Sequence, residues 1–127
     1  GTRLGPYEIL SLLGEGGMGE VYRARDQRLG RDVAIKVLHP GQLDSEAAKQ
    51  RFLKEARATS ALNHPNIVTI YDIGSENSFT YLVMELVEGS TLARQIPSGG
   101  MPRKTFLSIA TQIASAIDKA HRAGILH

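Results

Sequence analysis

Four glycines lie within the eight-residue segment GEGGMGEV, residues 14–21, between two segments rich in strand-forming residues. Glycine weakens regular structure, but it lets a ligand approach the backbone closely because no side chain intervenes. Backbone N–H groups in such a loop can surround phosphate oxygens. The segment therefore indicates a phosphate-binding loop, and an ordinary glycine-rich hairpin turn is the alternative interpretation.

A lysine occupies the middle of the apolar segment VAIKVL, residues 33–38. Because side chains alternate along a strand, Lys36 is expected to share one face with Ala34 and Leu38. A buried charge without a partner loses several kcal/mol of solvation, so a nearby anion is one explanation for this lysine. A lysine of an edge strand, with its ammonium reaching water, is the other.

The next helical segment carries an acid within its apolar stripe. Ser45 is expected to cap a helix that runs to about Leu62. Helical spacing places Glu55 on one face with Ala48, Phe52, Thr59 and Leu62. We expect Glu55 to hold the ammonium of Lys36 toward a further anionic group, whereas a solvated acid at the margin of the stripe is the alternative.

Two common phosphate-binding motifs do not fit the glycine segment. A dinucleotide-binding turn needs a helix directly after its glycines, whereas EVYRARD is rich in strand formers. The phosphate loop GxxxxGK[ST] needs Lys and Ser or Thr where this sequence has Glu20 and Val21. A hairpin of two strands remains, which can fold over a triphosphate with its backbone N–H groups near the phosphate oxygens.

The order of elements predicts an α+β fold. Strands are expected at residues 7–13, 20–24, 33–38, 67–73 and 79–87, around the one helix after Ser45. Beyond a hinge near residues 86–89 the pattern becomes helical. A short helix is expected within residues 91–96, and a long amphipathic helix from Pro102, with Gly124 just past its end.

Composition excludes several classes of function. The net charge of +2, without any Lys/Arg block, argues against a nucleic-acid partner. The absence of cysteine excludes disulfides and thiol catalysis and fits a reducing compartment. No apolar run has the length needed to cross a bilayer.

Taken together, these motifs resemble the N-terminal half of a protein kinase domain. The glycines, VAIK ending at Lys36, and Glu55 are followed in order by NHPNIV, YLVMELVEG and AHRAGILH. GEGGMGEVYRARD and LNHPNIV are most similar to the eukaryotic-like Ser/Thr kinases of bacteria. The resemblance implies a kinase N-lobe over residues 1–87, with a five-stranded antiparallel sheet and one long helix. Residues 88–127 would form the hinge exit and the first helices of an incomplete C-lobe.

The resemblance also implies that ATP binds here, together with Mg²⁺ whose ligands lie beyond this chain. Lys36 would bind the α- and β-phosphates, oriented by Glu55. The loop over the phosphates would consist of Gly14, Glu15, Gly16, Gly17, Met18, Gly19, Glu20 and Val21. The remaining contacts would be made by Leu13, Val21 and Ala34 around the adenine, Met84 as gatekeeper, the backbone of Glu85 and Val87, and Thr91 at the ribose.

His127 matches the first residue of the family's catalytic loop, and the catalytic base, the metal ligands and the activation loop of the family follow that position. We therefore expect the 127 residues alone to be inactive, as part of a kinase that phosphorylates protein hydroxyls. A kinase-like module that binds nucleotide or partners without catalysis is the second hypothesis. An unrelated α+β binding domain with chance glycines is the third.

The expected partners are ATP and the protein substrates of the intact kinase, in the cytoplasm. Relatives are often joined to a membrane segment further along the chain. The last helix carries an apolar stripe of Ile109, Ile113 and Ile117, which would pack against the rest of a kinase domain. Left bare, this stripe is expected to favour self-association.

Overall fold

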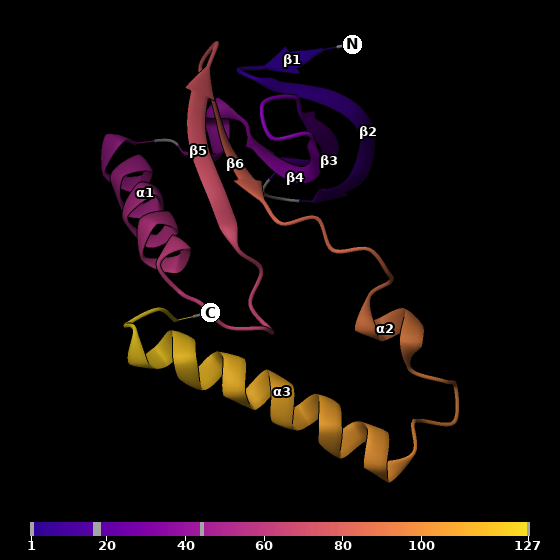
Figure 1. Ribbon diagram of the computed structural model, residues 1–127. Helices are drawn as coiled ribbons and strands as arrows, with labels where there is room; N and C mark the ends of the chain where they lie inside the picture. Colours follow the sequence, from indigo (N-terminus) through magenta and orange to yellow (C-terminus); the bar gives the residue numbers. More distant parts are fainter. Residues whose placement is uncertain (1, 17–18, 44, 127) are drawn as a thin grey trace.

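The computed structural model describes residues 2–16, 19–43 and 45–126 (Figure 1). Its strands form one six-stranded antiparallel sheet in the order β1-β2-β3-β4-β6-β5. The strands are β1 (Arg3–Leu4), β2 (Tyr7–Gly16), β3 (Gly19–Asp26), β4 (Arg31–Leu38), β5 (Ile70–Glu76) and β6 (Phe79–Met84). The predicted α+β class is confirmed, and so is each of the expected strands, although β5 and β6 have shifted boundaries.

The two-residue strand β1 is an addition that the sequence pattern did not predict. It pairs with the start of β2, where Arg3 lies opposite Glu8 and Leu4 opposite Tyr7. A strand this short shows no alternation of polar and apolar residues, so only the chain reversal at Gly5 reveals it. The φ of Gly5 is 56°, a conformation that favours glycine.

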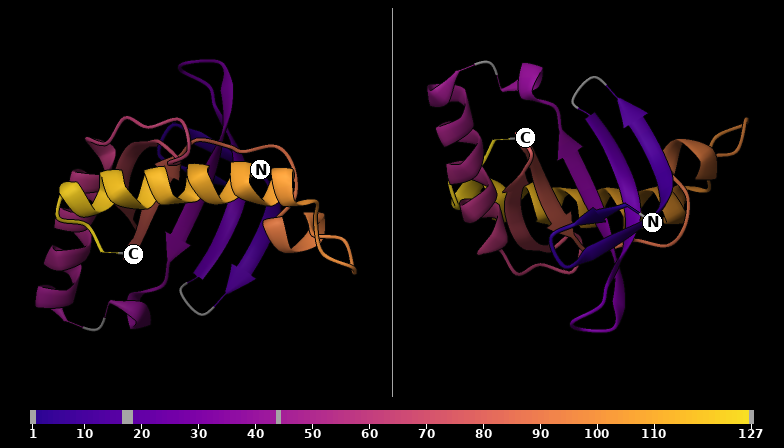
Figure 2. Two further views of the ribbon diagram at one scale, coloured as in Figure 1. Left: turned by 90° about the horizontal axis from the view of Figure 1, so that it is seen from below. Right: turned by 90° about the horizontal axis from the view of Figure 1, so that it is seen from above.

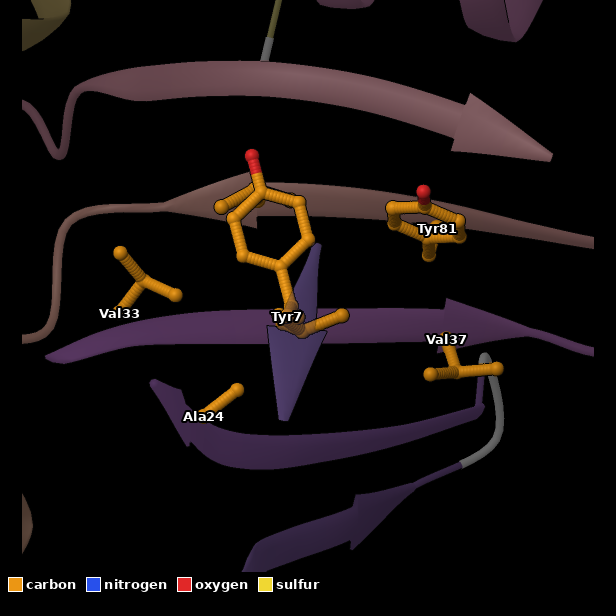
Figure 3. Close-up of a cluster of buried hydrophobic side chains, with 7 residues drawn as sticks. Tyr7, Ala24, Val33, Val37 and Tyr81 are labelled. Atoms are coloured by element: carbon orange, nitrogen blue, oxygen red, sulfur yellow. The ribbon is translucent and has the colours of Figure 1, made fainter. Parts of the chain in front are cut away.

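One face of the sheet forms the hydrophobic core. Alternate residues of β4 point into it, and Val33 and Ile35 have no exposed surface. The rings of Tyr7 and Tyr81 meet edge to face with their centroids 6.4 Å apart (Figure 3). The full cluster consists of Tyr7, Ala24, Val33, Ile35, Val37, Tyr81 and Val83.

A short 3₁₀ turn, η1 (Pro40–Gln42), leads into helix α1 (Glu46–Ser60), which lies beside β5 (Figures 1 and 2). The Ser45 hydroxyl accepts a hydrogen bond from the backbone N–H of Ala48 at 3.0 Å, which confirms the predicted N-cap. Ala56 is the buried residue of this helix.

An extended segment after β6 leads to the short helix α2 (Leu92–Gln95) and then to the long helix α3 (Arg103–Arg122), as predicted. Gly124, with φ 80°, lies just after the end of α3. Figure 1 shows α3 below the sheet, and the left view of Figure 2 shows it running across several of the strands. Two hydrogen bonds connect α3 to the loop after α1, from His64 to Ser115 at 2.9 Å and from Asn66 to Gln112 at 3.0 Å.

Candidate functional site

The sheet face opposite the core collects the predicted site residues. Val21 of β3 pairs with Lys36 of β4, and Ala34 of β4 pairs with Met84 of β6. Side chains alternate along each strand, and the core takes Val33, Ile35 and Val37 of β4. Val21, Ala34, Lys36 and Met84 therefore share the face that the core does not use. We call it the nucleotide face, because the sequence predicts that a nucleotide binds there.

Lys36 is half-buried on this face and lines a cavity of about 670 Å³. The strands contribute Val21, Leu82 and Met84 to the cavity, and Thr59 near the end of α1 also lines it. The opposite wall comes from the α3 region, with Ala116, Ile117, Ala120, His121 and Ile125. An ammonium group in a mostly apolar cavity is a binding group for an anion.

The glycine segment forms a hairpin, which confirms the predicted arrangement of two strands. Gly14 pairs with Val21, and Gly16 pairs with Gly19. The φ of Gly19 is 129°, which favours glycine. At Gly14 and Gly16 an added Cβ would meet no heavy atom within 4 Å, so the backbone there is bare. Gly17 and Met18 lie outside the described residues.

Leu13 lies where the pairing of β2 with β3 is irregular. Leu12 pairs with Tyr22 and Gly14 pairs with Val21, so Leu13 has no partner in the register. Such bulges redirect side chains and occur frequently beside active sites. The side chain of Leu13 is 50% exposed, and Val87 beyond β6 is 64% exposed. Two of the predicted adenine contacts are thus exposed apolar groups.

The segment after β6 is fixed by two hydrogen bonds to Thr69, the residue just before β5. The Glu85 N–H donates to the Thr69 carbonyl at 2.8 Å, and the Thr69 N–H donates to the Glu85 carboxylate at 3.1 Å. Further along, the Thr91 hydroxyl accepts a hydrogen bond from the Arg94 N–H at 3.3 Å and caps α2. The proton of this hydroxyl remains available to a ligand.

Glu20, another predicted loop residue, turns its side chain to the opposite face from Val21. Its carboxylate lies 2.5 Å from Nε2 of His39, just after β4. The His39 ring in turn meets the Phe79 ring edge to face, with centroids 5.6 Å apart. Only the backbone of Glu20 is therefore placed to face a ligand, whereas its side chain connects the hairpin to the end of β4.

Glu55, the predicted partner of Lys36, does not contact Lys36 in this structure. Ala56 is the residue of α1 that is buried toward β5, whereas Glu55 is exposed. Glu55 lines a separate groove of about 410 Å³ with Arg51, Lys54 and residues 123–126. Within the described ranges 19–43 and 45–126, no ion pair joins Glu55 to Lys36. Adjacent helical residues differ by 100° around the axis, and the apolar pattern did not fix the rotation of α1 that finely.

An ion-pair network on the nucleotide face was not predicted. Arg23 pairs with Ala34 across the sheet, two residues beyond Val21. Its guanidinium contacts the Asp32 carboxylate at 2.8 Å and the Glu88 carboxylate at 3.1 Å. Arg25 donates to Asp32 at 3.0 Å, and this hydrogen bond together with that from Arg23 lowers the pKa of Asp32. The alternation of residues along β3 could have placed Arg23 on this face, but its contact with Glu88 depends on tertiary structure.

Magnesium, which the resemblance implied, has no ligand set in this part of the chain. Among residues 2–16, 19–43 and 45–126 no cluster of three His, Cys, Asp or Glu side chains could hold a metal ion. We therefore derive no metal-dependent step from these residues. In the same ranges, no helix is both long enough and apolar enough to span a membrane.

Comparison with known proteins identifies the family of the chain. Residues 7–127 match the family model described as a protein kinase domain. The Ser/Thr-protein kinase PrkC of Bacillus subtilis is 47% identical over 124 residues, which cover 97% of this chain and 19% of PrkC. PknB of Mycobacterium leprae is 42% identical over 126 residues, covering 95% of this chain and 20% of that protein. The crystal structure of the Mycobacterium tuberculosis PknI kinase domain superposes with a TM-score of 0.84 at 30% identity, covering all of this chain and 52% of that one.

The fold is therefore that of a protein kinase, and the chain belongs to the protein kinase family. More specifically, it is the N-terminal portion of a Ser/Thr protein kinase domain of the kind found in bacteria. The chain spans about a fifth of the length of these curated relatives and about half of the PknI kinase domain.

Proposed function

We propose that the nucleotide face binds ATP and that the intact protein transfers the γ-phosphoryl group to Ser or Thr hydroxyls of other proteins. The observation that carries this proposal is the cross-strand pairing of Lys36 with Val21, at the base of the bare glycine hairpin. Phosphate recognition needs a cation and close backbone N–H donors in one place, and this pairing supplies both.

The likeness to protein kinases supports the following roles for the individual residues. Lys36 neutralises charge on the α- and β-phosphates, and the hairpin backbone from Gly14 to Val21 donates hydrogen bonds to the phosphate oxygens. Leu13, Val21 and Ala34 pack on the adenine, and Met84 limits the depth of the pocket. The backbone of Glu85 and Val87 contacts the adenine edge, and the Thr91 hydroxyl contacts the ribose. Residues 1–87 act as the N-lobe in this proposal, and residues 88–127 begin the C-lobe.

In the transfer step, the substrate hydroxyl oxygen bonds to the γ-phosphorus as the bond from that phosphorus to the bridging oxygen breaks. ADP leaves with the electron pair, and the hydroxyl proton passes to a base. The described residues supply positioning and charge neutralisation but no base suited to this geometry, so we infer that the 127 residues alone do not turn over ATP. Bound Mg²⁺ would supply further charge neutralisation in the intact kinase.

Glu55 has a role in this proposal that requires a different position of α1. In active protein kinases the strand lysine is held by an ion pair to a glutamate of the following helix. Here the two side chains line different cavities. We infer that α1 moves against β5 when the active arrangement forms, which brings Glu55 toward Lys36.

The test is phosphoryl transfer from γ-labelled ATP by the intact kinase, with peptides that carry only Ser and Thr or only Tyr as acceptors. We expect label on the Ser/Thr peptides alone. ATP binding without transfer to any protein or peptide would instead support the non-catalytic module. Label on the Tyr peptides would contradict the proposed acceptor class.

The isolated chain of 127 residues offers a second test. The side chains of Ile113 and Ile117 on α3 are 45% and 43% exposed, which supports self-association of this piece. We expect sedimentation to show oligomers that Ile113→Glu disperses. A monomer of the unmodified chain at all concentrations would contradict this part of the proposal.

A further inference from the structure

The guanidinium of Arg23 connects two parts of the chain that border the nucleotide face. Its Nε and Nη2 atoms lie 2.9 and 2.8 Å from one oxygen of Asp32, and its Nη1 atom lies 3.1 Å from Oε1 of Glu88. Asp32 belongs to the sheet, whereas Glu88 belongs to the segment between β6 and α2. Arg23 thus connects Asp32 in the sheet with Glu88 in the segment between β6 and α2.

The contacts with Asp32 orient the guanidinium of Arg23 independently of Glu88. Arg25 donates to the second oxygen of Asp32 at 3.0 Å, so this carboxylate is shared by two guanidinium groups. A planar guanidinium bonded through two nitrogens to one carboxylate has few orientations left. The remaining nitrogen is therefore directed at Glu88.

The position of this contact relates it to the nucleotide. Arg23 lies opposite Ala34, which the proposed function places against the adenine, and is two residues from Val21 on the same face. Glu88 directly follows Val87, whose backbone is proposed to contact the adenine edge. The contact therefore joins β3, which borders the proposed adenine site, to the segment after β6, which also borders that site.

We propose that the Arg23–Glu88 ion pair is a positioning contact that sets the spacing between β3 and the segment after β6, and thereby the KM for ATP. The inference rests on the proposed ATP site. Neither residue touches the reacting phosphates, so the pair acts on nucleotide binding and leaves the chemical step unchanged. The side chains of Arg23 and Glu88 are 35% and 72% exposed, so the contact is weak and sensitive to salt.

The experiment measures KM for ATP and kcat of the intact kinase at low and high ionic strength. Glu88→Gln breaks the contact and leaves Asp32 untouched, so we expect KM to rise about two- to fivefold with kcat unchanged. Raising the salt should bring the unmodified kinase to the KM of the variant, whose own KM should change little. The double variant should match Arg23→Gln, because without Arg23 the Glu88 substitution has no ion pair left to remove.

Asp118→Asn provides the matched control. It breaks another exposed ion pair, between Arg122 and Asp118 at 3.0 Å on α3, and neither of these residues lines the cavity on the nucleotide face. This variant should keep the KM and the salt dependence of the unmodified kinase. An effect of the Glu88 substitution on thermal stability alone would reveal only a structural role and overturn the inference.

The outcomes separate this inference from the proposed function. If the unmodified kinase turns over ATP and Glu88→Gln has the same KM at low salt, the inference is wrong and the ATP site stands. If the unmodified kinase neither binds nor turns over ATP, both are wrong. A fall in kcat at unchanged KM would also contradict the inference, because it would place the pair in the chemical step.

Discussion

Lys36 lies directly opposite Val21 in the sheet, so a half-buried ammonium and the end of a bare glycine hairpin occupy neighbouring positions on one face. The core uses the other face of the same strands. A lysine therefore occurs in the middle of a strand of apolar residues without entering the core. This arrangement is the structural basis of the proposed ATP site.

Lys36→Met should abolish most of the activity and leave the fold intact. Methionine keeps the apolar length of the side chain and removes the charge that we propose neutralises the phosphates. We expect kcat to fall about a hundredfold or more, a loss of the size found when one electrostatic contact to a transition state is removed. Lys54→Met, at an exposed position of α1, is the control and should retain full activity. Equal activity of both variants would exclude Lys36 from the site.

Glu55→Gln should lower the turnover of the kinase and leave its stability unchanged. Glu55 is exposed and has no ion pair with Lys36 here, so the free energy of unfolding should not change. If α1 moves to form the pair in the active kinase, kcat should fall about tenfold while the affinity for ATP stays similar. Glu46→Gln in the first turn of the same helix should change neither kcat nor the affinity for ATP. Weaker ATP binding at unchanged kcat would argue against an orienting role.

Gly16→Ala tests whether a ligand lies against the hairpin backbone. An added Cβ would meet no heavy atom of the protein within 4 Å, so stability should not fall. A phosphate resting on this backbone would collide with the methyl group, and we expect the affinity for ATP to drop about tenfold. Gly41→Ala, also in open space, is the control. Unchanged affinity in both variants would mean that the nucleotide does not approach Gly16.

Gly74→Ala should destabilise the sheet for a reason unrelated to nucleotide. An added Cβ would lie 2.5 Å from Cζ and the hydroxyl oxygen of Tyr81, whose side chain is buried. We expect a loss of about 1–3 kcal/mol in the free energy of unfolding in urea. Gly99→Ala has no atom within 4 Å of the new Cβ and should behave as the unmodified protein. No change in Gly74→Ala would mean that Tyr81 is positioned differently.

Ionisation of the Tyr7 hydroxyl should lower the stability of the protein at high pH. Burial and the hydrogen bond from its hydroxyl to Asp72 at 2.9 Å raise the pKa of Tyr7 from 10.0 to about 12. Because the pKa of the folded state is the higher one, this stabilisation is fully present below pH 10 and is lost as the pH rises toward 12. Burial also raises the pKa of Tyr81, so tyrosinate absorbance should detect late titration from both residues. Tyr7→Phe should remove its share of this late titration and leave that of Tyr81. An unchanged late titration in Tyr7→Phe would contradict the assignment.

Much of the fold could be predicted because its signals are local. The serine cap of α1 and the glycine after α3 are encoded by single residue types. Alternation in β4 likewise predicted which face Lys36 occupies. By contrast, β1 is too short to show a pattern, and its pairing depends on the turn at Gly5.

The parts of the site that depend on tertiary packing could not be predicted. Glu55 and Ala56 are neighbours in sequence, and the contact of α1 with β5 decides which of them is buried. The Arg23–Glu88 contact joins residues far apart in the chain and depends on the path of the segment after β6. Periodicity defines the face of an element but not the partner that the face will meet.

The central claim, that Lys36 faces the phosphates of ATP, can be tested by affinity labelling with an acyl phosphate of ATP. Such a reagent binds as the nucleotide and acylates the lysine nearest its phosphates, which peptide mass spectrometry then identifies. We predict modification of Lys36 that an excess of ATP prevents, with Lys49, Lys54, Lys104 and Lys119 modified only slowly and without protection. Labelling of those four lysines as fast as Lys36, with no protection by ATP, would contradict the account.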